Sequence, residues 1–479
     1  MVISKNLFSK NWLVALAFIL FVASWSYAAN GVRYKDRLFK VSKAKTVTVA
    51  KDVPFLDSEG GNNYSSLSSL MESFGVEPMM YFYSKEVSKN QPLLMDIYEP
   101  VDDTAEKRAA VIVCHGGAFV ASSKDDFGQK SVAYTDSLAA RGYVTASLEY
   151  RQGVLMSEVE TKDGYDEIID SVDFARTVYK AIQDVHAAVR YFRKNAAELK
   201  VDTNKIYIVG NSAGGMLALE NIYAKSKKDF PAYVDKKGAT TLGELGEYGE
   251  IGVGGHANGV VALWGAIHNA DLVKNSKVPV FLAHGDSDYV MPFGKGHAIS
   301  DVDRMLGEKG SMLMMLGMSL NVHTPTLYGS AVIDSILNAG KVYHEFYAPR
   351  GFGLKHEFYD ATRTDENGDE VVYADSVQNK VFAFLYNLAV DSVPAWKKPT
   401  SLPMVALALA SRITLGEDNQ SFTVERGENL AYAVFELNGR RVMAGRASRG
   451  QTVDLSMLRN GVYYLRVQGE PVRRIGLRK

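Results

Sequence analysis

A single serine is the residue of this chain that most clearly points to covalent chemistry. Ser212 is the centre of Gly210-Asn-Ser-Ala-Gly214, a Gly-x-Ser-x-Gly motif. A strand-like run (205–209) precedes the motif and a helix-forming run (216–220) follows it. A serine on such a sharp strand-to-helix turn exposes its hydroxyl at a helix N-terminus, where backbone N–H groups favour negative charge. The motif in this context predicts that Ser212 is a nucleophile.

Acyl transfer by a serine also requires hydrogen-bond donors for the developing oxyanion. His115, Gly116 and Gly117 directly follow the apolar run 109–114, and glycines let the backbone approach a ligand closely. We expect the N–H groups of Gly116, Gly117 and Ala213, the residue after the nucleophile, to form an oxyanion hole. His115 is expected to hold the loop rather than to act as a second base.

The acid and the base are expected in the chain order serine, acid, histidine. Asp286 and Asp288 both follow the apolar run 278–283, and Asp288 is favoured because it lies farther along the loop. Its carboxylate would accept the N–H of the base and fix the tautomer, whereas Asp286 would brace the loop. Of the nine histidines, His356 follows a predicted strand and a loop that can carry its imidazole over the sheet. We therefore predict His356 as the base.

Strand-like and helical runs alternate along the part of the chain that contains these residues. This alternation predicts an α/β fold with a mostly parallel central sheet and helices on both faces. The predicted strands are 94–98, 109–114, 143–150, 205–209, 259–264, 278–283 and 342–347, and the predicted helices are 131–141 and 174–199. Residues 30–89 suggest an edge strand, a cap or a substrate-facing loop. The Met-rich segment 293–324 is compatible with a lid or with a core helix.

The two ends of the chain have different compositions from the centre. Residues 1–28 have the charged and apolar regions and the small residues of a signal peptide, so we expect cleavage near Ala28 or Ala29. The catalytic domain is predicted to span 29–392 and a proline-containing linker 393–410. Residues 411–479 have the alternation and the Asn438-Gly439 turn of a small β-domain. This domain is basic, with eleven Arg and Lys against four acidic residues from Arg426 onward.

The overall composition is that of a globular protein. The 479 residues are 47% hydrophobic and carry a formal net charge of −1, so no global charge indicates a nucleic-acid partner. Cys114 is the only cysteine, which excludes an intramolecular disulfide and a multi-cysteine metal site. Its place in an apolar run predicts a small core residue. The predicted reaction needs neither a metal nor an organic cofactor.

The central residues resemble the α/β-hydrolase carboxylesterases and lipases of the group that has His-Gly-Gly before its first long helix. The resemblance runs from about Leu94 to Ala389 and includes the motifs around Gly116, Ser212, Asp288 and His356, together with the Tyr150-Arg151 pair. It implies an α/β-hydrolase fold in which Ser212, Asp288 and His356 are nucleophile, acid and base, and Gly116, Gly117 and Ala213 form the oxyanion hole. Ala118 departs from the third glycine of many members, and Lys355 from the glycine that often precedes the histidine.

The C-terminal segment is similar to the sorting domains of proteins exported by type IX secretion, in its residues 438–442 and 458–467. This similarity implies a secretion-machinery partner and export or surface attachment; a polysaccharide-binding β-sandwich is the alternative. The sequence therefore predicts a secreted serine carboxylic ester hydrolase. Its expected substrates are acetyl or feruloyl esters of plant cell-wall polysaccharide. A short-chain or lipid esterase and a non-catalytic glycan-binding protein are the alternatives.

Overall fold

The computed structural model divides the chain into two compact units, the second of which begins at Lys397. It describes residues 31–57, 59, 63–65, 69, 82–125, 131–160, 162, 165–235, 241–299, 318–349, 354–356, 358, 362–364, 370–393, 413–415, 421–424, 429–436, 441–467 and 473–477. The expected signal peptide, the Asn438-Gly439 turn and most of the expected linker and of the Met-rich segment lie outside these residues.

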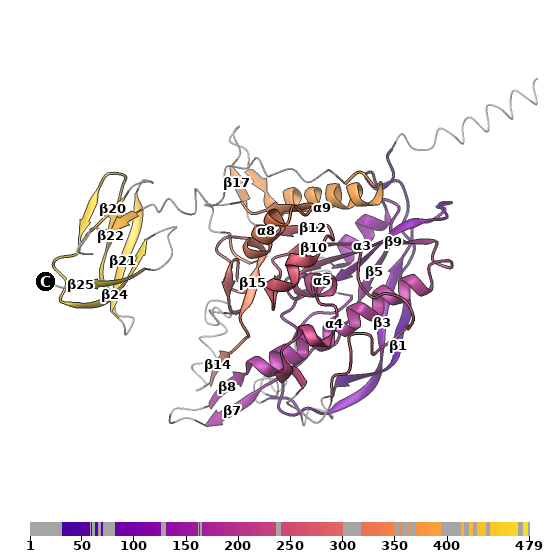
Figure 1. The fold of residues 1–479 in the computed structure, drawn as a ribbon, viewed down its shortest axis with the longest axis horizontal. Helices are drawn as coiled ribbons and strands as arrows, with labels where there is room; N and C mark the ends of the chain where they lie inside the picture. The colour runs from indigo at the N-terminus through magenta and orange to yellow at the C-terminus, as the bar shows by residue number, and fades with distance from the viewer. Residues whose placement is uncertain are drawn as a thin grey trace, which may run out of the picture. The chain divides into compact units, whose positions relative to one another are not determined.

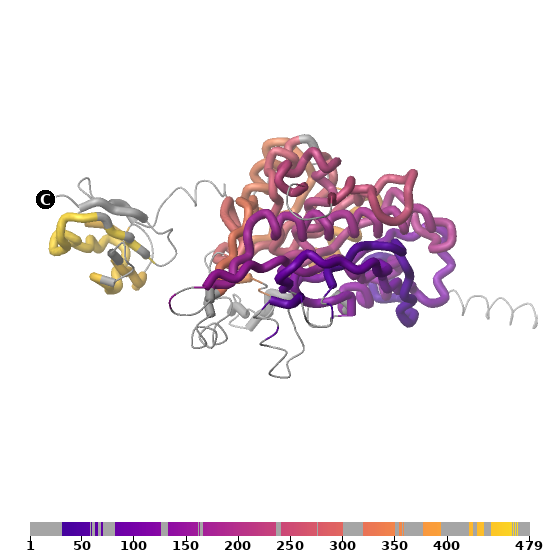
Figure 2. Tube along the Cα trace, turned by 90° about the horizontal axis from the view of Figure 1, so that it is seen from below, coloured from indigo at the N-terminus to yellow at the C-terminus, as the bar shows by residue number. Residues whose placement is uncertain are grey.

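An eight-stranded sheet forms the centre of the first unit (Figure 1). The pairs β1–β3 and β3–β5 are antiparallel, and every pair from β5–β4 through to β12–β16 is parallel. The colours of Figure 2, from indigo at one edge of this unit to orange at the other, follow the strand order. In spatial order the strands are β1 (Lys45–Leu56), β3 (Ser88–Tyr98), β5 (Val144–Leu148), β4 (Arg108–Cys114), β9 (Val201–Asn211), β10 (Gly259–Leu263), β12 (Val280–Ala283) and β16 (His344–Tyr347).

Helices cover both faces of this sheet because its central strands are apolar on both sides. On β4, Ala110, Ile112 and Cys114 pack into one core with α4 and α5, while Ala109, Val111 and Val113 pack into a second core with α3 and α9. The helices are α3 (Ser131–Ala139), α4 (Ser171–Lys194), α5 (Ala213–Tyr223), α8 (Ser330–Ala339) and α9 (Tyr373–Ala389), with the 3₁₀ turns η1 (Lys227–Asp229), η2 (Ala232–Asp235) and η3 (Ala270–Asn275). The predicted α/β fold is confirmed.

The boundaries of several elements differ from the predicted ones. Helix α4 begins after Asp170, whose side chain accepts hydrogen bonds from the N–H groups of Val172 and Asp173. It ends at Lys194 rather than at 199, because the chain turns at Asn195. Strand β9 extends from 201 to 211, beyond the predicted 205–209. In the region without an assigned function, β1 is the edge strand of the sheet.

The described residues of the first unit also form smaller sheets, and those of the second unit form two sheets. In the described part of the second unit the regular elements are strands, as predicted, and their core includes Phe422, Val434 and Leu465. Among the described residues, no helix has the length and apolar character needed to cross a bilayer. The small sheets of the first unit are β2 (Phe82–Tyr83) with β6 (Val154–Leu155); β14 (Met318–Val322), β8 (Tyr165–Ile169) and β7 (Ser157–Glu160); β11 (Ala266–Ile267), β15 (Leu327–Gly329) and β13 (Lys295–Gly296); and β17 (Thr362–Thr364) with β18 (Glu370–Val372). The sheets of the second unit are β19 (Ile413–Leu415), β20 (Ser421–Val424) and β23 (Thr452–Asp454); and β22 (Arg441–Ala447), β21 (Leu430–Glu436), β24 (Gly461–Val467) and β25 (Arg473–Leu477).

Candidate active site

Ser212 occupies the one-residue turn between strand β9 and helix α5. Its backbone φ is 54° and its ψ is −118°, a region that L-residues rarely adopt. Such a sharp turn requires glycines around it. A Cβ on Gly210 would lie 2.0 Å from the carbonyl oxygen of Gly214, and a Cβ on Gly214 would lie 2.1 Å from that of Cys114. The glycines of the motif therefore let α5 pack directly against the neighbouring backbone and hold Ser212 at the helix N-terminus.

Two hydrogen bonds join Ser212, His356 and Asp288 in a chain. The Nε2 atom of His356 lies 2.9 Å from Oγ of Ser212, and its Nδ1 atom lies 2.7 Å from Oδ2 of Asp288. A carboxylate only accepts hydrogen bonds, so Nδ1 carries the proton and Nε2 is left to accept the Ser212 hydroxyl proton. The structure thus brings together the three residues predicted as nucleophile, acid and base. Along the chain, His356 lies 144 positions after Ser212 and 68 positions after Asp288.

Several groups besides His356 hold the carboxylate of Asp288. Its Oδ1 accepts the backbone N–H groups of Val290 and Met291 at 2.8 and 2.9 Å. The Nε2 atom of His284 lies 3.2 Å from Oδ2, and both side chains are completely buried. Burial by itself raises the pKa of Asp288, but the hydrogen bonds from His284 and His356 more than offset this effect and hold its pKa well below the ordinary value. Asp288 is therefore an anion beside the imidazole, and it is Asp288 rather than Asp286 that reaches His356.

His284 was not predicted to support the acid. It follows β12, and its Nδ1 atom lies 2.9 Å from Oγ of Ser330 at the start of α8. This contact orients the ring so that Nε2 points toward Asp288. The sequence contains a signal for this residue, because His284 lies four positions before Asp288, but four residues in a loop do not specify a contact.

The loop predicted to stabilise an oxyanion follows strand β4 directly. Gly117 has a φ of 100°, and a Cβ there would lie 2.1 Å from the carbonyl oxygen of Ala121, so only glycine fits. Ala118 and Phe119 also have positive φ values, 52° and 64°. Glycine would adopt the conformation of Ala118 without strain, so alanine at this position has an energetic cost. At α5, Ala213 is the first helical residue, and its N–H has no acceptor within the helix.

His115 is buried inside this loop, as expected for a supporting residue. Its ring stacks on Tyr150 with the ring centroids 4.2 Å apart, and its Nδ1–H donates to the carbonyl oxygen of Gly116. Cys114 is fully buried, and burial raises the pKa of its thiol to about 12, so it is a protonated core residue.

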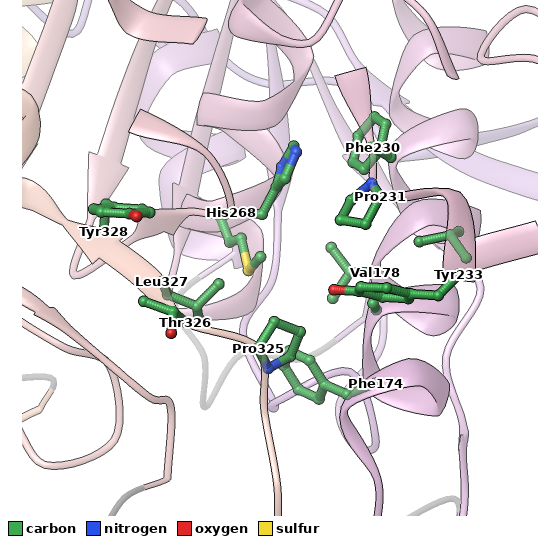
Figure 3. A pocket seen from close by; sticks show the side chains of 13 residues that line it. Phe174, Val178, Phe230, Pro231, Tyr233, His268, Pro325, Thr326, Leu327 and Tyr328 are labelled. Carbon is green, nitrogen blue, oxygen red and sulfur yellow. The ribbon is translucent and has the colours of Figure 1, made fainter. Parts of the chain in front are cut away.

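A cavity of about 180 Å³ has in its wall Met216 of α5, the residue four positions after Ser212. The N-terminal part of α4 and the segments around Pro231 and Leu327 contribute the other walls, and Figure 3 shows these side chains facing a common space. The lining is mostly apolar and aromatic: Phe174, Ala175, Val178, Met216, Phe230, Pro231, Tyr233, Val234, His268, Pro325, Thr326, Leu327 and Tyr328.

One wall of this cavity contains an ion pair that sequence reasoning missed. The Nδ1 atom of His268 lies 2.8 Å from the carboxylate of Glu220, which is fully buried in α5. The Nε2 atom of His268 lies 2.9 Å from the carbonyl oxygen of Asp229. Burial lowers the pKa of His268, but the attraction of Glu220 and its hydrogen bonds raise the pKa above the ordinary value overall. Since both ring nitrogens face acceptors, His268 is an imidazolium.

Other histidines that sequence reasoning set aside lie away from Ser212. His344 is paired with Asp334 at 3.0 Å, and His186 packs edge-on against His256 in a buried part of α4. Within the described ranges, no group of three or more His, Cys, Asp or Glu side chains is arranged to hold a metal ion.

Three family models match parts of the chain. The carboxylesterase family matches residues 71–234, which contain Gly116, Gly117 and Ser212, and the BD-FAE family matches 175–302, which contain Ser212 and Asp288. The secretion system C-terminal sorting domain matches residues 418–473. His356 lies outside all three matched segments.

Individual relatives match over limited lengths. Carboxylesterase 3B of Mus musculus is 32% identical over 127 residues, 26% of this chain and 19% of the relative. The non-reducing polyketide synthase Preu3 of Preussia isomera is 26% identical over 29% of this chain and 5% of the relative. The chain thus spans less than a fifth of these two curated relatives.

Among solved structures, esterase 2 of Thermogutta terrifontis with bound propionate is similar at 20% identity and a TM-score of 0.36, over 62% of this chain and 90% of that one. The same esterase phosphonylated by cyclosarin gives 18% identity and a TM-score of 0.37, over 62% and 89% of the two chains. The central part of the chain, which has the mostly parallel sheet of an α/β fold, is thus similar to the carboxylesterase and BD-FAE families, and its C-terminal part is similar to the secretion system C-terminal sorting domain.

Proposed function

We propose that this protein is a secreted serine esterase in which Ser212, His356 and Asp288 act as nucleophile, base and acid. The observation that carries the proposal is the continuous hydrogen-bonded chain from Asp288 through His356 to Ser212. His356 takes the hydroxyl proton of Ser212 as Oγ attacks the ester carbonyl carbon, and the anion of Asp288 stabilises the resulting imidazolium. His356 then protonates the leaving alcohol. Water attacks the acyl-serine by the same route in reverse, which releases the acid and restores the serine.

The negative charge of the tetrahedral intermediate needs donors that are in place before the reaction. In the proposed mechanism these are the N–H groups of Gly116 and Gly117 in the loop after β4 and of Ala213 at the start of α5. Removing one donor of this kind from a serine hydrolase costs about 3 kcal/mol of transition-state stabilisation. The helix N-terminus at Ala213 adds a favourable potential for the same charge.

We propose ester-linked groups on plant cell-wall polysaccharide, acetyl or feruloyl on xylan, as the substrates. The sorting domain indicates export or attachment to the cell surface, where polymers are accessible. The cavity of about 180 Å³ is only slightly larger than an apolar cavity of about 150 Å³ that holds one benzene ring. A cavity of this size accommodates a small acyl group or a single aromatic ring, and a short-chain or lipid esterase is the second candidate.

Turnover of p-nitrophenyl acetate by the full chain, beside Ser212→Ala, tests the chemistry. We expect the variant to lose activity by several orders of magnitude, because the proposed mechanism forms the acyl intermediate on Oγ of Ser212. Equal inertness of both proteins on acetate and on longer esters would contradict the proposal and favour a glycan-binding protein. A second outcome is a protein that hydrolyses p-nitrophenyl acetate but releases acetate or ferulate from xylan at no more than the background rate. That result would contradict the polysaccharide substrate and leave the esterase chemistry intact.

A further inference from the structure

The loop that contains Gly116 and Gly117 is strained and must be held from outside. Between residues 117 and 122, Ala118, Phe119 and Ser122 are non-glycine residues with positive φ values of 52°, 64° and 79°. Such backbone conformations are strained in residues with a Cβ, so the loop keeps this conformation only where surrounding contacts determine it.

These contacts come mainly from one segment, residues 149–153, directly after strand β5. The N–H of Gly153 donates to the carbonyl oxygen of Phe119 at 2.8 Å, and Nε2 of Gln152 donates to that of Ser122 at 2.8 Å. The carboxylate of Glu149 accepts the N–H of Lys124 at 3.0 Å. The loop is therefore supported along its length by the end of the neighbouring strand.

The segment 149–153 is itself anchored firmly to helix α4. The side chain of Arg151 is 3% exposed and pairs with the fully buried carboxylate of Asp184 at 2.8 Å. The backbone N–H of Arg151 donates to the same carboxylate at 2.7 Å, and its Nη2 also reaches Oε1 of Gln183 at 3.0 Å. Tyr150, next to Arg151, therefore lies in a segment that is fixed to α4.

Tyr150 makes the contact nearest to the proposed oxyanion donors. Its hydroxyl lies 2.9 Å from the carbonyl oxygen of His115 and 3.1 Å from that of Gly116, and it is the donor in both contacts. The side chain is buried, and its ring stacks on His115. One hydroxyl proton is therefore shared between two consecutive carbonyl groups.

The planarity of the peptide bond connects this contact to catalysis. The carbonyl of His115 and the N–H of Gly116 belong to one peptide plane, and the carbonyl of Gly116 and the N–H of Gly117 belong to the next. Both peptides are trans, so in each plane the N–H points away from the carbonyl oxygen. A group that fixes the two carbonyl oxygens on one side therefore fixes the two N–H groups on the other side.

We propose that Tyr150 is a positioning residue for the oxyanion hole: its hydroxyl holds the carbonyl groups of His115 and Gly116 so that the N–H groups of Gly116 and Gly117 face the ester oxygen. The proposal rests on the proposed esterase function and adds to it. It predicts that the hydroxyl of Tyr150 contributes to binding of the transition state and contributes little to binding of the ground state, because the donors act on charge that develops only during the reaction.

The test is Tyr150→Phe, which removes the hydroxyl and keeps the ring. Tyr143→Phe and Tyr223→Phe are matched controls, since both rings are buried and their hydroxyls have no hydrogen-bond partner in the part of the chain that the structure describes. For Tyr150→Phe we expect kcat on p-nitrophenyl acetate to fall about 10-fold, which corresponds to one hydrogen bond of ordinary strength, with KM changed less than about 2-fold. We expect both controls to stay within about 2-fold of wild type in both constants.

A transition-state analogue provides a readout that a purely structural role would not change. The affinity for a trifluoromethyl ketone, whose adduct with Ser212 has an oxyanion, should fall in Tyr150→Phe by the same factor as kcat/KM. Thermal unfolding ensures that each variant is compared in its folded state. A Tyr150→Phe protein with wild-type kcat and wild-type affinity for the ketone would overturn the positioning role and leave the esterase proposal intact. A wild-type protein that is inert on every ester would overturn both.

Discussion

Replacing Asp288 by asparagine changes one functional group, and the structure predicts what the new side chain does. The Oδ1 atom of Asp288 accepts two backbone N–H groups, from Val290 and Met291. An asparagine must place its carbonyl oxygen there, since its amide nitrogen cannot accept hydrogen bonds. The Nδ2 atom, a donor, then occupies the position of Oδ2, which lies 2.7 Å from Nδ1 of His356. His356 can satisfy this donor only by accepting at Nδ1.

The consequence of this exchange is the wrong tautomer of the base. With Nδ1 as the acceptor, the proton of the neutral imidazole moves to Nε2, the atom that lies 2.9 Å from Oγ of Ser212. A protonated Nε2 cannot take the serine proton. We expect kcat to fall by about 10³–10⁴-fold, or about 4–5.5 kcal/mol of transition-state stabilisation, with little change in KM.

The assay is steady-state hydrolysis of p-nitrophenyl acetate by Asp288→Asn and by Asp286→Asn. The second variant makes the same chemical change two residues away, in a side chain that does not reach His356, and we expect its kcat to stay within a few-fold of wild type. Thermal unfolding should show that Asp288→Asn remains folded, because the asparagine keeps both backbone hydrogen bonds. If Asp288→Asn retained more than about a tenth of the wild-type kcat, or if Asp286→Asn lost as much, the tautomer argument would be wrong.

Two further predictions follow from packing and from charge. In Gly214→Ala, the new Cβ would lie 2.1 Å from the carbonyl oxygen of Cys114, so α5 must move, and we expect a loss of roughly 3 kcal/mol of unfolding free energy together with most of the activity. Gly246→Ala is the control, because nothing lies within 4 Å of a Cβ there, and equal effects of the two substitutions in urea unfolding and ester hydrolysis would contradict the reasoning. Burial raises the pKa of Glu149 from 4.5 to about 6, so its contribution to stability is present below pH 4.5 and is lost as the pH rises through about 6. Glu149→Gln removes the charge and keeps an acceptor for Lys124, and we expect it to be more stable than wild type by about 2 kcal/mol at pH 7.5 but not at pH 4.5, a difference that urea unfolding at the two pH values measures.

Features that depend on neighbouring residues can be predicted from the amino-acid sequence alone. The turn at Ser212 is local, because Gly210 and Gly214 permit it and the flanking apolar runs specify the strand and the helix. The alternation of strands and helices similarly determines a sheet that is buried on both faces, and the short alternating runs after residue 411 determine a separate β-unit. Asp288 was preferred to Asp286 because it lies farther along the loop, and His356 was preferred because of the strand and loop before it. Their pairing with Ser212 remained an expectation until distances were available.

Contacts between residues far apart in the chain could be identified only from the packed structure. His356 meets Ser212 across 144 residues, and Tyr150 meets the loop at His115 across 35. No local pattern indicates that Glu220 of α5 would hold His268 as a cation in the cavity wall. Each of these contacts joins segments that are distant along the chain, and their separation is set only when the whole sheet and its covering helices pack. Local residue types therefore determine which groups can react, and packing determines which of them meet.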